Sequence, residues 1–189
     1  MNYLDFTGTI LSLLGTYYFI KADIRMWPVY ISATILNSLL YFKYNMHGTM
    51  YLEILYLCLS VSGWLFWQKL AKDKHSISFI SHTQILMLVI SWLITFMTIA
   101  TIHMKFASIE YPLLEAFAIS ASIFAYILSA RKLLQCWLVW IIADGAYAIL
   151  MAMQGLQFHT ALFICYLFLA CQGLKKWLAL YNQQASEGA

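Results

Sequence analysis

The chain has 189 residues, of which 63% are hydrophobic and 10% are charged, and its formal net charge at pH 7 is +3. Because soluble domains carry about 25% charged residues, this composition excludes a water-soluble globule and predicts a polytopic membrane protein. So small a net charge gives no reason to expect a nucleic-acid partner.

Seven apolar runs follow one another along the chain, each near the length of about 20 residues that crosses a bilayer as a helix. They cover residues 4–20, 26–42, 49–68, 84–102, 112–130, 134–153 and 158–177. Pro28 and Pro112 lie near the starts of their runs, where helices tolerate proline. The pattern predicts an all-α membrane protein with seven transmembrane helices.

The basic residues predict the orientation of these helices. In a seven-helix topology, Lys43 and Lys105 fall on one side of the membrane. Nine others fall on the opposite side: Lys21, Arg25, Lys69, Lys72, Lys74, Arg131, Lys132, Lys175 and Lys176. By the positive-inside rule, we expect the N-terminus outside and the C-terminus in the cytoplasm.

An internal repeat relates the two halves of the chain without a gap. Adding 110 to first-half numbers pairs residues of the same type: Trp27 with Trp137, Tyr56 with Tyr166, Gly63 with Gly173, and Trp67 with Trp177. Helices one to three therefore repeat as helices five to seven, with the fourth as a linker. Such parallel repeats are a transporter architecture.

The repeat predicts one membrane domain over residues 1–178. Within it we expect a first three-helix bundle at 1–70, a linker helix at 84–104 and a second three-helix bundle at 110–178. Residues 179–189 are expected to form a short polar tail.

The sixth run carries a charged group at its centre, Asp144. A carboxylate at this depth costs roughly 2.5–3.5 kcal/mol on insertion scales, so it is rarely left without a partner or a function. At helical spacing, Trp137, Trp140 and Tyr147 share its face. Aromatic rings attract cations and a carboxylate neutralises them, so this face predicts a site for a flat cation. The alternative is an aromatic belt at the interface together with a structural aspartate.

The equivalent face of the second run is also aromatic and polar. It contains Trp27, Tyr30, Thr34, Asn37 and Tyr41. If the two halves face each other, the two stripes line one cavity near the midplane of the membrane, where transporters of repeat design bind substrate. Alternatively, Thr34 and Asn37 hydrogen-bond between helices as packing groups. Glu53 and Glu115, near the outer ends of their runs, could attract a cation at the external mouth, but we favour their interpretation as solvated end residues.

The remaining residues do not predict an enzyme. The histidines lie at the ends of runs or in loops, the four cysteines lack metal-ligand spacing, and there is no nucleotide-binding glycine loop. We therefore expect no catalytic residues, no metal and no cofactor. A membrane receptor that binds without transport remains an alternative.

At these motifs the chain resembles the PnuC family of bacterial vitamin transporters, whose 3+1+3 helix plan is similar to that of the SWEET sugar transporters. The residues that carry the resemblance are Trp27-Pro28, Gly63-Trp64-x-x-Trp67, Trp137-x-x-Trp140 with a polar residue four positions later, Gln154-Gly155-Leu156, and Gly173-x-x-x-Trp177. Two positions depart from the family pattern. Asp144 stands where Asn is usual, and Tyr126 stands where a helix-five motif usually ends in Gln.

The resemblance implies facilitated uptake of nicotinamide riboside, a pyridinium cation on a ribose, by a homotrimer in membrane lipid. Thiamine or another cationic vitamin precursor is the alternative substrate. The implied substrate-binding residues are those of the two stripes and Tyr126.

Overall fold

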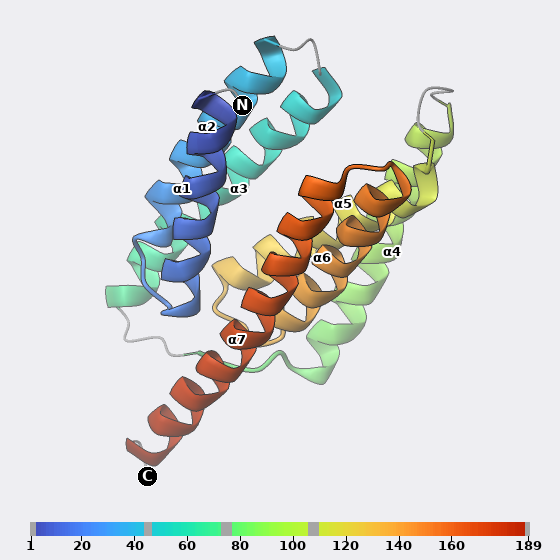
Figure 1. The fold of residues 1–189 in the computed structure, drawn as a ribbon. Helices are drawn as coiled ribbons and strands as arrows, with labels where there is room; N and C mark the ends of the chain where they lie inside the picture. Colours follow the sequence, from blue (N-terminus) through green and yellow to red (C-terminus); the bar gives the residue numbers. More distant parts are fainter. Residues whose placement is uncertain (1–2, 44–46, 73–76, 106–109, 188–189) are drawn as a thin grey trace. The chain divides into compact units, whose positions relative to one another are not determined.

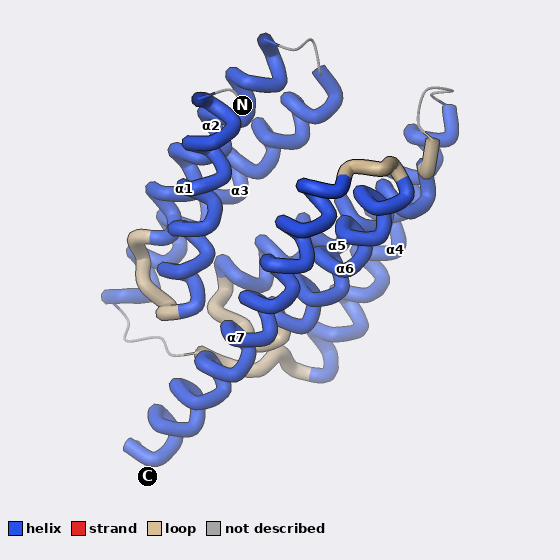
Figure 2. Tube along the Cα trace, viewed as in Figure 1, coloured by secondary structure: helices blue, strands red, loops and turns tan. Residues whose placement is uncertain are grey.

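The computed structural model describes residues 3–43, 47–72, 77–105 and 110–187, and within them it contains seven α-helices. They are α1 (Tyr3–Ile20), α2 (Met26–Lys43), α3 (His47–Lys72), α4 (His82–Lys105), α5 (Pro112–Ala130), α6 (Cys136–Met153) and α7 (Gln157–Glu187). Short described loops join α1 to α2, α5 to α6, and α6 to α7 (Figure 2). Lys74 and His75 lie outside the described residues.

The predicted all-helical architecture is confirmed, with each apolar run forming one helix. Within the described residues, five helical segments are long and apolar enough to cross a membrane: Met50–Lys69, Thr83–Lys105, Pro112–Ala130, Cys136–Met153 and Gln157–Glu187. The apolar part of α1, Phe6–Ile20, is shorter. In α2 the polar side chains of Ser32, Thr34, Asn37 and Ser38 interrupt a mainly apolar sequence.

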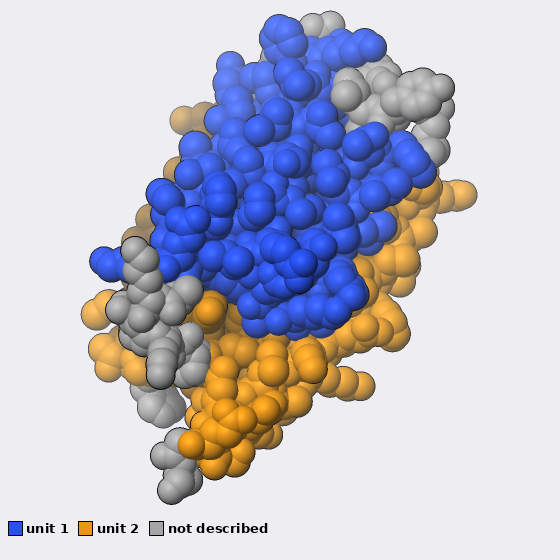
Figure 3. Space-filling view, turned by 90° about the vertical axis from the view of Figure 1, so that its left-hand side faces the viewer, with its two compact units in different colours: residues 1–76 blue, residues 77–189 orange. Residues whose placement is uncertain are grey.

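The chain divides into two compact units, residues 1–76 and residues 77–189 (Figure 3). In the first unit, α2 packs against both α1 and α3 (Figure 1). In the second unit, α4 packs on α5, α5 on α6, and α6 on α7. The second unit thus repeats the helix order of the first and adds α4 to it.

Small residues allow close helix packing along α5. Its buried positions are mostly alanine and serine: Ala116, Ala118, Ser120, Ala121, Ser122, Ala125 and Ser129. The three serine hydroxyls donate to carbonyls of their own helix, so these hydroxyls are hydrogen-bonded although they are buried. Small side chains let membrane helices approach each other closely, which places α4 and α6 against this helix.

The turns between the first two helices of each unit have the same backbone conformation. Ala22 and Lys132, which are 110 positions apart, both adopt a left-handed conformation with φ of 53°. In each turn the residue that follows donates its N–H to a carbonyl five residues back, from Asp23 to Tyr18 at 3.0 Å and from Leu133 to Leu128 at 3.1 Å. The repeat seen in the sequence is therefore also a repeat of local structure.

Candidate functional site

Each unit contains a tryptophan that packs directly on a glycine of the neighbouring helix. A Cβ atom at Gly63 of α3 would fall 2.2 Å from Cη2 of Trp27, and one at Gly173 of α7 would fall 2.3 Å from Cη2 of Trp137. A second tryptophan meets each of these rings edge-on, because Trp67 lies 5.7 Å from Trp27 and Trp177 lies 5.6 Å from Trp137. These contacts join α2 to α3 and α6 to α7.

Trp27 and Trp137 are almost wholly enclosed by this packing. Their exposed fractions are 0% and 1%. A ring that is enclosed on all sides offers no face for a ligand to stack on. Their contacts therefore describe packing between neighbouring helices.

Trp140 packs toward the other neighbour of α6. Its indole N–H donates to the hydroxyl of Ser129 on α5 at 3.1 Å, and its ring meets that of Tyr126 edge-on at 5.3 Å. Trp140 and Tyr126 are both half-buried, so each keeps some exposed surface. The structure thus brings together two residues that the sequence analysis drew from separate motifs.

Tyr147, also on α6, packs against α7. Its ring stacks on Phe163 of α7, with centroids 4.8 Å apart and an angle of 14° between the planes. The predicted stripe on α6 therefore divides between two neighbours: Trp137 and Tyr147 contact α7, whereas Trp140 contacts α5.

Asp144 is buried in the same helix, with 7% of its surface exposed. Among the residues that the structure describes, no hydrogen bond or ion pair to its carboxylate is found. Burying a carboxylate without a partner is costly, so such a group is usually retained for a function. Within the same described ranges, no cluster of His, Cys, Asp or Glu could hold a metal ion.

In the first unit, Tyr30 occupies the position equivalent to Trp140. Its hydroxyl lies 2.9 Å from that of Thr16 on α1, and a Cβ at Gly15 would fall 2.6 Å from its ring. This residue joins α2 to α1 as Trp140 joins α6 to α5. Both positions of the repeat therefore carry an aromatic ring directed at the preceding helix.

Thr34, equivalent to Asp144, bonds to its own helix. Its hydroxyl donates to the carbonyls of Tyr30 and Ile31, both at 3.0 Å, and its side chain is buried. These local bonds satisfy the hydroxyl without a group from another helix. Tyr41, at the outer end of the predicted stripe, is half-buried.

Asn37 contacts both neighbours of α2. Its amide nitrogen donates to a carboxylate oxygen of Glu53 on α3 at 3.4 Å. Its amide oxygen lies where a Cβ at Gly8 of α1 would fall 2.4 Å away. The interpretation of Glu53 as a solvated end residue is wrong, because the side chain is half-buried and hydrogen-bonded to a neighbouring helix. The 16-residue separation between the partners left no local signal for this pair.

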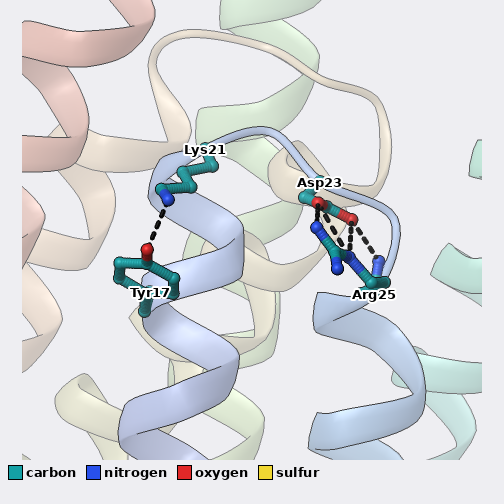
Figure 4. A network of polar contacts seen from close by, with 4 residues as sticks. All are labelled: Tyr17, Lys21, Asp23 and Arg25. Carbon is teal, nitrogen blue, oxygen red and sulfur yellow. Dashed lines mark hydrogen bonds and ion pairs between the residues drawn. The ribbon is translucent and has the colours of Figure 1, made fainter.

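Charged side chains gather at the α1–α2 turn (Figure 4). The guanidinium of Arg25 pairs with Asp23 at 2.6 Å and lies over the ring of Tyr18, while the Lys21 ammonium contacts Tyr17. Hydrogen bonds from Arg25 lower the pKa of Asp23 below its ordinary value of 3.8. Cations held among aromatic rings are typical of residues at a membrane edge.

The α5–α6 turn binds an extended segment that precedes α4. Ser78 donates to the carbonyl of Lys132 at 3.2 Å and accepts from the N–H of Leu134 at 2.9 Å. The side-chain oxygen of Gln135 accepts from the N–H of Ile80 at 3.1 Å. Phe79 meets Tyr181 of α7 edge-on at 4.8 Å. The segment therefore ties α4, the turn and the end of α7 into one unit.

Comparisons with known proteins agree on the class of protein. A crystal structure titled "Vitamin B3 transporter PnuC" has the same fold, with a TM-score of 0.76 and 17% identity, over 96% of this chain and 83% of that one. The nicotinamide riboside transporter PnuC of Escherichia coli K12 is 20% identical over 98% of this chain and 89% of its own length. The riboflavin/roseoflavin transporter RibM of Streptomyces davaonensis is 21% identical, over 92% of this chain and 83% of its own. These are membrane transporters of vitamins.

The family model for nicotinamide mononucleotide transporters matches residues 2–179, and the chain belongs to that family. The predicted family is therefore confirmed. The chain is a transporter and not an enzyme, and it is a multi-pass protein of the inner membrane.

Proposed function

We propose that this chain takes up nicotinamide riboside, a pyridinium cation joined to a ribose. The observation that carries the proposal is Asp144, a buried carboxylate in an apolar span with half-buried aromatic residues on the same helix. A carboxylate near aromatic faces favours a flat cation. The similarity to the PnuC of Escherichia coli supports the same substrate.

In this proposal all seven helices span the membrane in a 3+1+3 arrangement, with the N-terminus outside. The matching turns at Ala22 and Lys132 and the matching tryptophan–glycine contacts support two equivalent bundles. The excess of basic residues on one side supports the orientation. We further propose a substrate cavity that opens alternately to the two sides of the membrane, and a homotrimer.

Within that cavity we assign stacking of the ring to Trp140 with Tyr126 and Tyr147. Asp144 would neutralise the positive charge of the ring. From the first bundle, Tyr30, Asn37 and Tyr41 would hold polar substituents. A packing role, without contact to the substrate, is assigned to Thr34, Trp27 and Trp137. The Thr34 hydroxyl bonds to its own helix, and both indoles are buried.

Riboflavin is the second candidate substrate, because the chain is 21% identical to a riboflavin/roseoflavin transporter over most of its length. Thiamine is a third candidate, since it is a cation that a carboxylate would also attract. Asp144 favours the two cations over the neutral flavin.

The test is uptake of labelled nicotinamide riboside, thiamine and riboflavin by proteoliposomes that contain the purified chain. We expect saturable uptake of nicotinamide riboside, with the Asp144→Ala variant as a matched control that loses it. Binding without uptake would instead indicate a receptor. Uptake of thiamine or riboflavin alone would reassign the substrate, and uptake of none would contradict the proposal.

A further inference from the structure

The polar pair formed by Asn37 and Glu53 has no equivalent in the second unit. The positions 110 further along the chain are Tyr147 and Phe163, whose rings stack at 4.8 Å. Gly8, which makes room for the amide oxygen of Asn37, corresponds to Ala118. One half of the repeat therefore joins its second and third helices by a polar contact at a place where the other half uses two apolar rings.

This difference shows that helix packing does not require the polar pair. In the second unit the equivalent helices, α6 and α7, are held together by an aromatic stack at this position. The tryptophan–glycine contact is common to both units. Glu53 lies near the start of the span Met50–Lys69, at a position where the second unit has an apolar residue. We take its presence there to indicate a role other than packing.

The geometry leaves hydrogen-bonding capacity free on the carboxylate. Glu53 is half-buried, and within the described part of the chain it accepts one hydrogen bond, on Oε1 from Asn37. A carboxylate has two oxygens and about four lone-pair sites, so most of its acceptor capacity is unused. Beside it, Gly8 and Glu53 fix both ends of the Asn37 amide. The unused lone pairs of the Glu53 carboxylate are suitable acceptors for neighbouring hydroxyl groups.

We propose that Glu53 and Asn37 form a subsite for the polyhydroxyl part of the substrate, with Gly8 as a positioning residue that keeps the Asn37 amide in place. The inference rests on the proposed function. It assigns binding of the hydroxyl groups to residues of α2 and α3 in the first unit. A substrate that carries a sugar or sugar-alcohol chain, such as a riboside or a ribityl compound, fits this assignment.

Two pairs of ligands separate hydroxyl recognition from ring recognition. Nicotinamide riboside and 1-methylnicotinamide share a cationic pyridinium ring, but the second has a methyl group in place of the ribose. Riboflavin and lumiflavin share an isoalloxazine ring, but the second has a methyl group in place of the ribityl chain. The dissociation constants of all four are measured by calorimetry on the purified full chain.

We expect Glu53→Gln to weaken binding of the hydroxyl-bearing member of the pair that binds by about 10- to 100-fold, the effect of losing hydrogen bonds to a charged group. Binding of the methyl-bearing member should stay unchanged, which also shows that the variant is folded. Gly8→Ala should act in the same direction, because a methyl group there displaces the Asn37 amide. The control is Ser62→Ala on the same helix, whose exposed hydroxyl bonds to the Cys58 carbonyl, and it should change neither affinity.

Equal weakening of both members of a pair, or no weakening in either variant, would overturn the hydroxyl subsite and leave the proposed function standing. If the unmodified chain bound none of the four ligands, the proposed function would fail, and this inference would fail with it.

Discussion

The indole ring of Trp137 lies so close to the backbone of Gly173 that a Cβ atom at this glycine would fall 2.3 Å from the ring. Since real Cβ atoms do not approach other atoms so closely, alanine at Gly173 must move either the ring or α7. The same holds for Gly63 and Trp27 in the first unit, at 2.2 Å. Both contacts lie at equivalent positions, so they are part of the framework on which the two units are built.

The first prediction concerns this framework. Gly173→Ala should lower the free energy of unfolding by about 1–3 kcal/mol, the usual cost of overpacking a well-filled interior. The measurement is thermal unfolding of the purified chain in detergent. Gly145→Ala is the control, because its nearest neighbour, Leu167, would be 3.6 Å away, an ordinary contact. Equal stability of the two variants would argue against a tight tryptophan–glycine contact.

A second prediction concerns the left-handed residue of the α1–α2 turn. An L-residue in this conformation costs about 1–2 kcal/mol, and glycine adopts it without that cost but loses more backbone entropy on folding. Ala22→Gly should therefore raise the free energy of unfolding by up to about 1 kcal/mol, whereas Ala22→Val should lower it. Chemical denaturation measures both. A loss of stability with glycine would show that the turn is not left-handed.

The third prediction follows from the pKa of Asp23, which hydrogen bonds from Arg25 lower below 3.8. A carboxyl group whose pKa is lowered by folding stabilises the folded state above its unfolded pKa, and this contribution is lost as the pH falls through the folded pKa. Wild type and Asp23→Asn should therefore differ slightly in stability at neutral pH and converge below pH 3.8. High salt should reduce the difference, because the pair is exposed. A difference that grew on acidification would contradict this account.

The fourth prediction tests Trp140 as the stacking residue. Ser129→Ala removes the hydroxyl that accepts the indole N–H. Losing one neutral hydrogen bond costs about 0.5–1.5 kcal/mol, so substrate affinity should fall by roughly 2- to 13-fold without loss of the fold. Ser120→Ala on the same helix is the control, since its hydroxyl bonds to the carbonyl of Phe117. If both variants bound substrate equally, Trp140 would not be held in place by Ser129.

The apolar runs predicted the helices well, because length and hydrophobicity alone decide which segments can span a bilayer. The repeat was also readable, since pairs such as Gly63 and Gly173 recur at one spacing with their tryptophans. Periodicity placed Trp27 and Trp137 on the same helix faces as the polar residues. It could not reveal that each ring packs on a glycine 36 positions later in the chain and is buried there.

Other contacts depend on how distant segments meet. The hydrogen bond between Asn37 and Glu53 depends on the register of α2 against α3, which no local pattern encodes. The bridge between Ser78 and Leu133 joins a short segment without periodicity to a turn 55 positions away. The repeat did contain a signal for the polar pair: the equivalent positions in the second half carry Tyr147 and Phe163, so the two halves differ in residue type there.

The central claim is that Asp144 binds the positive charge of the substrate ring. The most direct test compares nicotinamide riboside with its 1,4-dihydro form, which has the same ribose and carboxamide but a neutral ring. Dissociation constants are measured for wild type and Asp144→Asn. The account predicts that the variant binds the cation at least about tenfold more weakly and binds the neutral form almost unchanged. An equal change for the two ligands, or none for the cation, would contradict it.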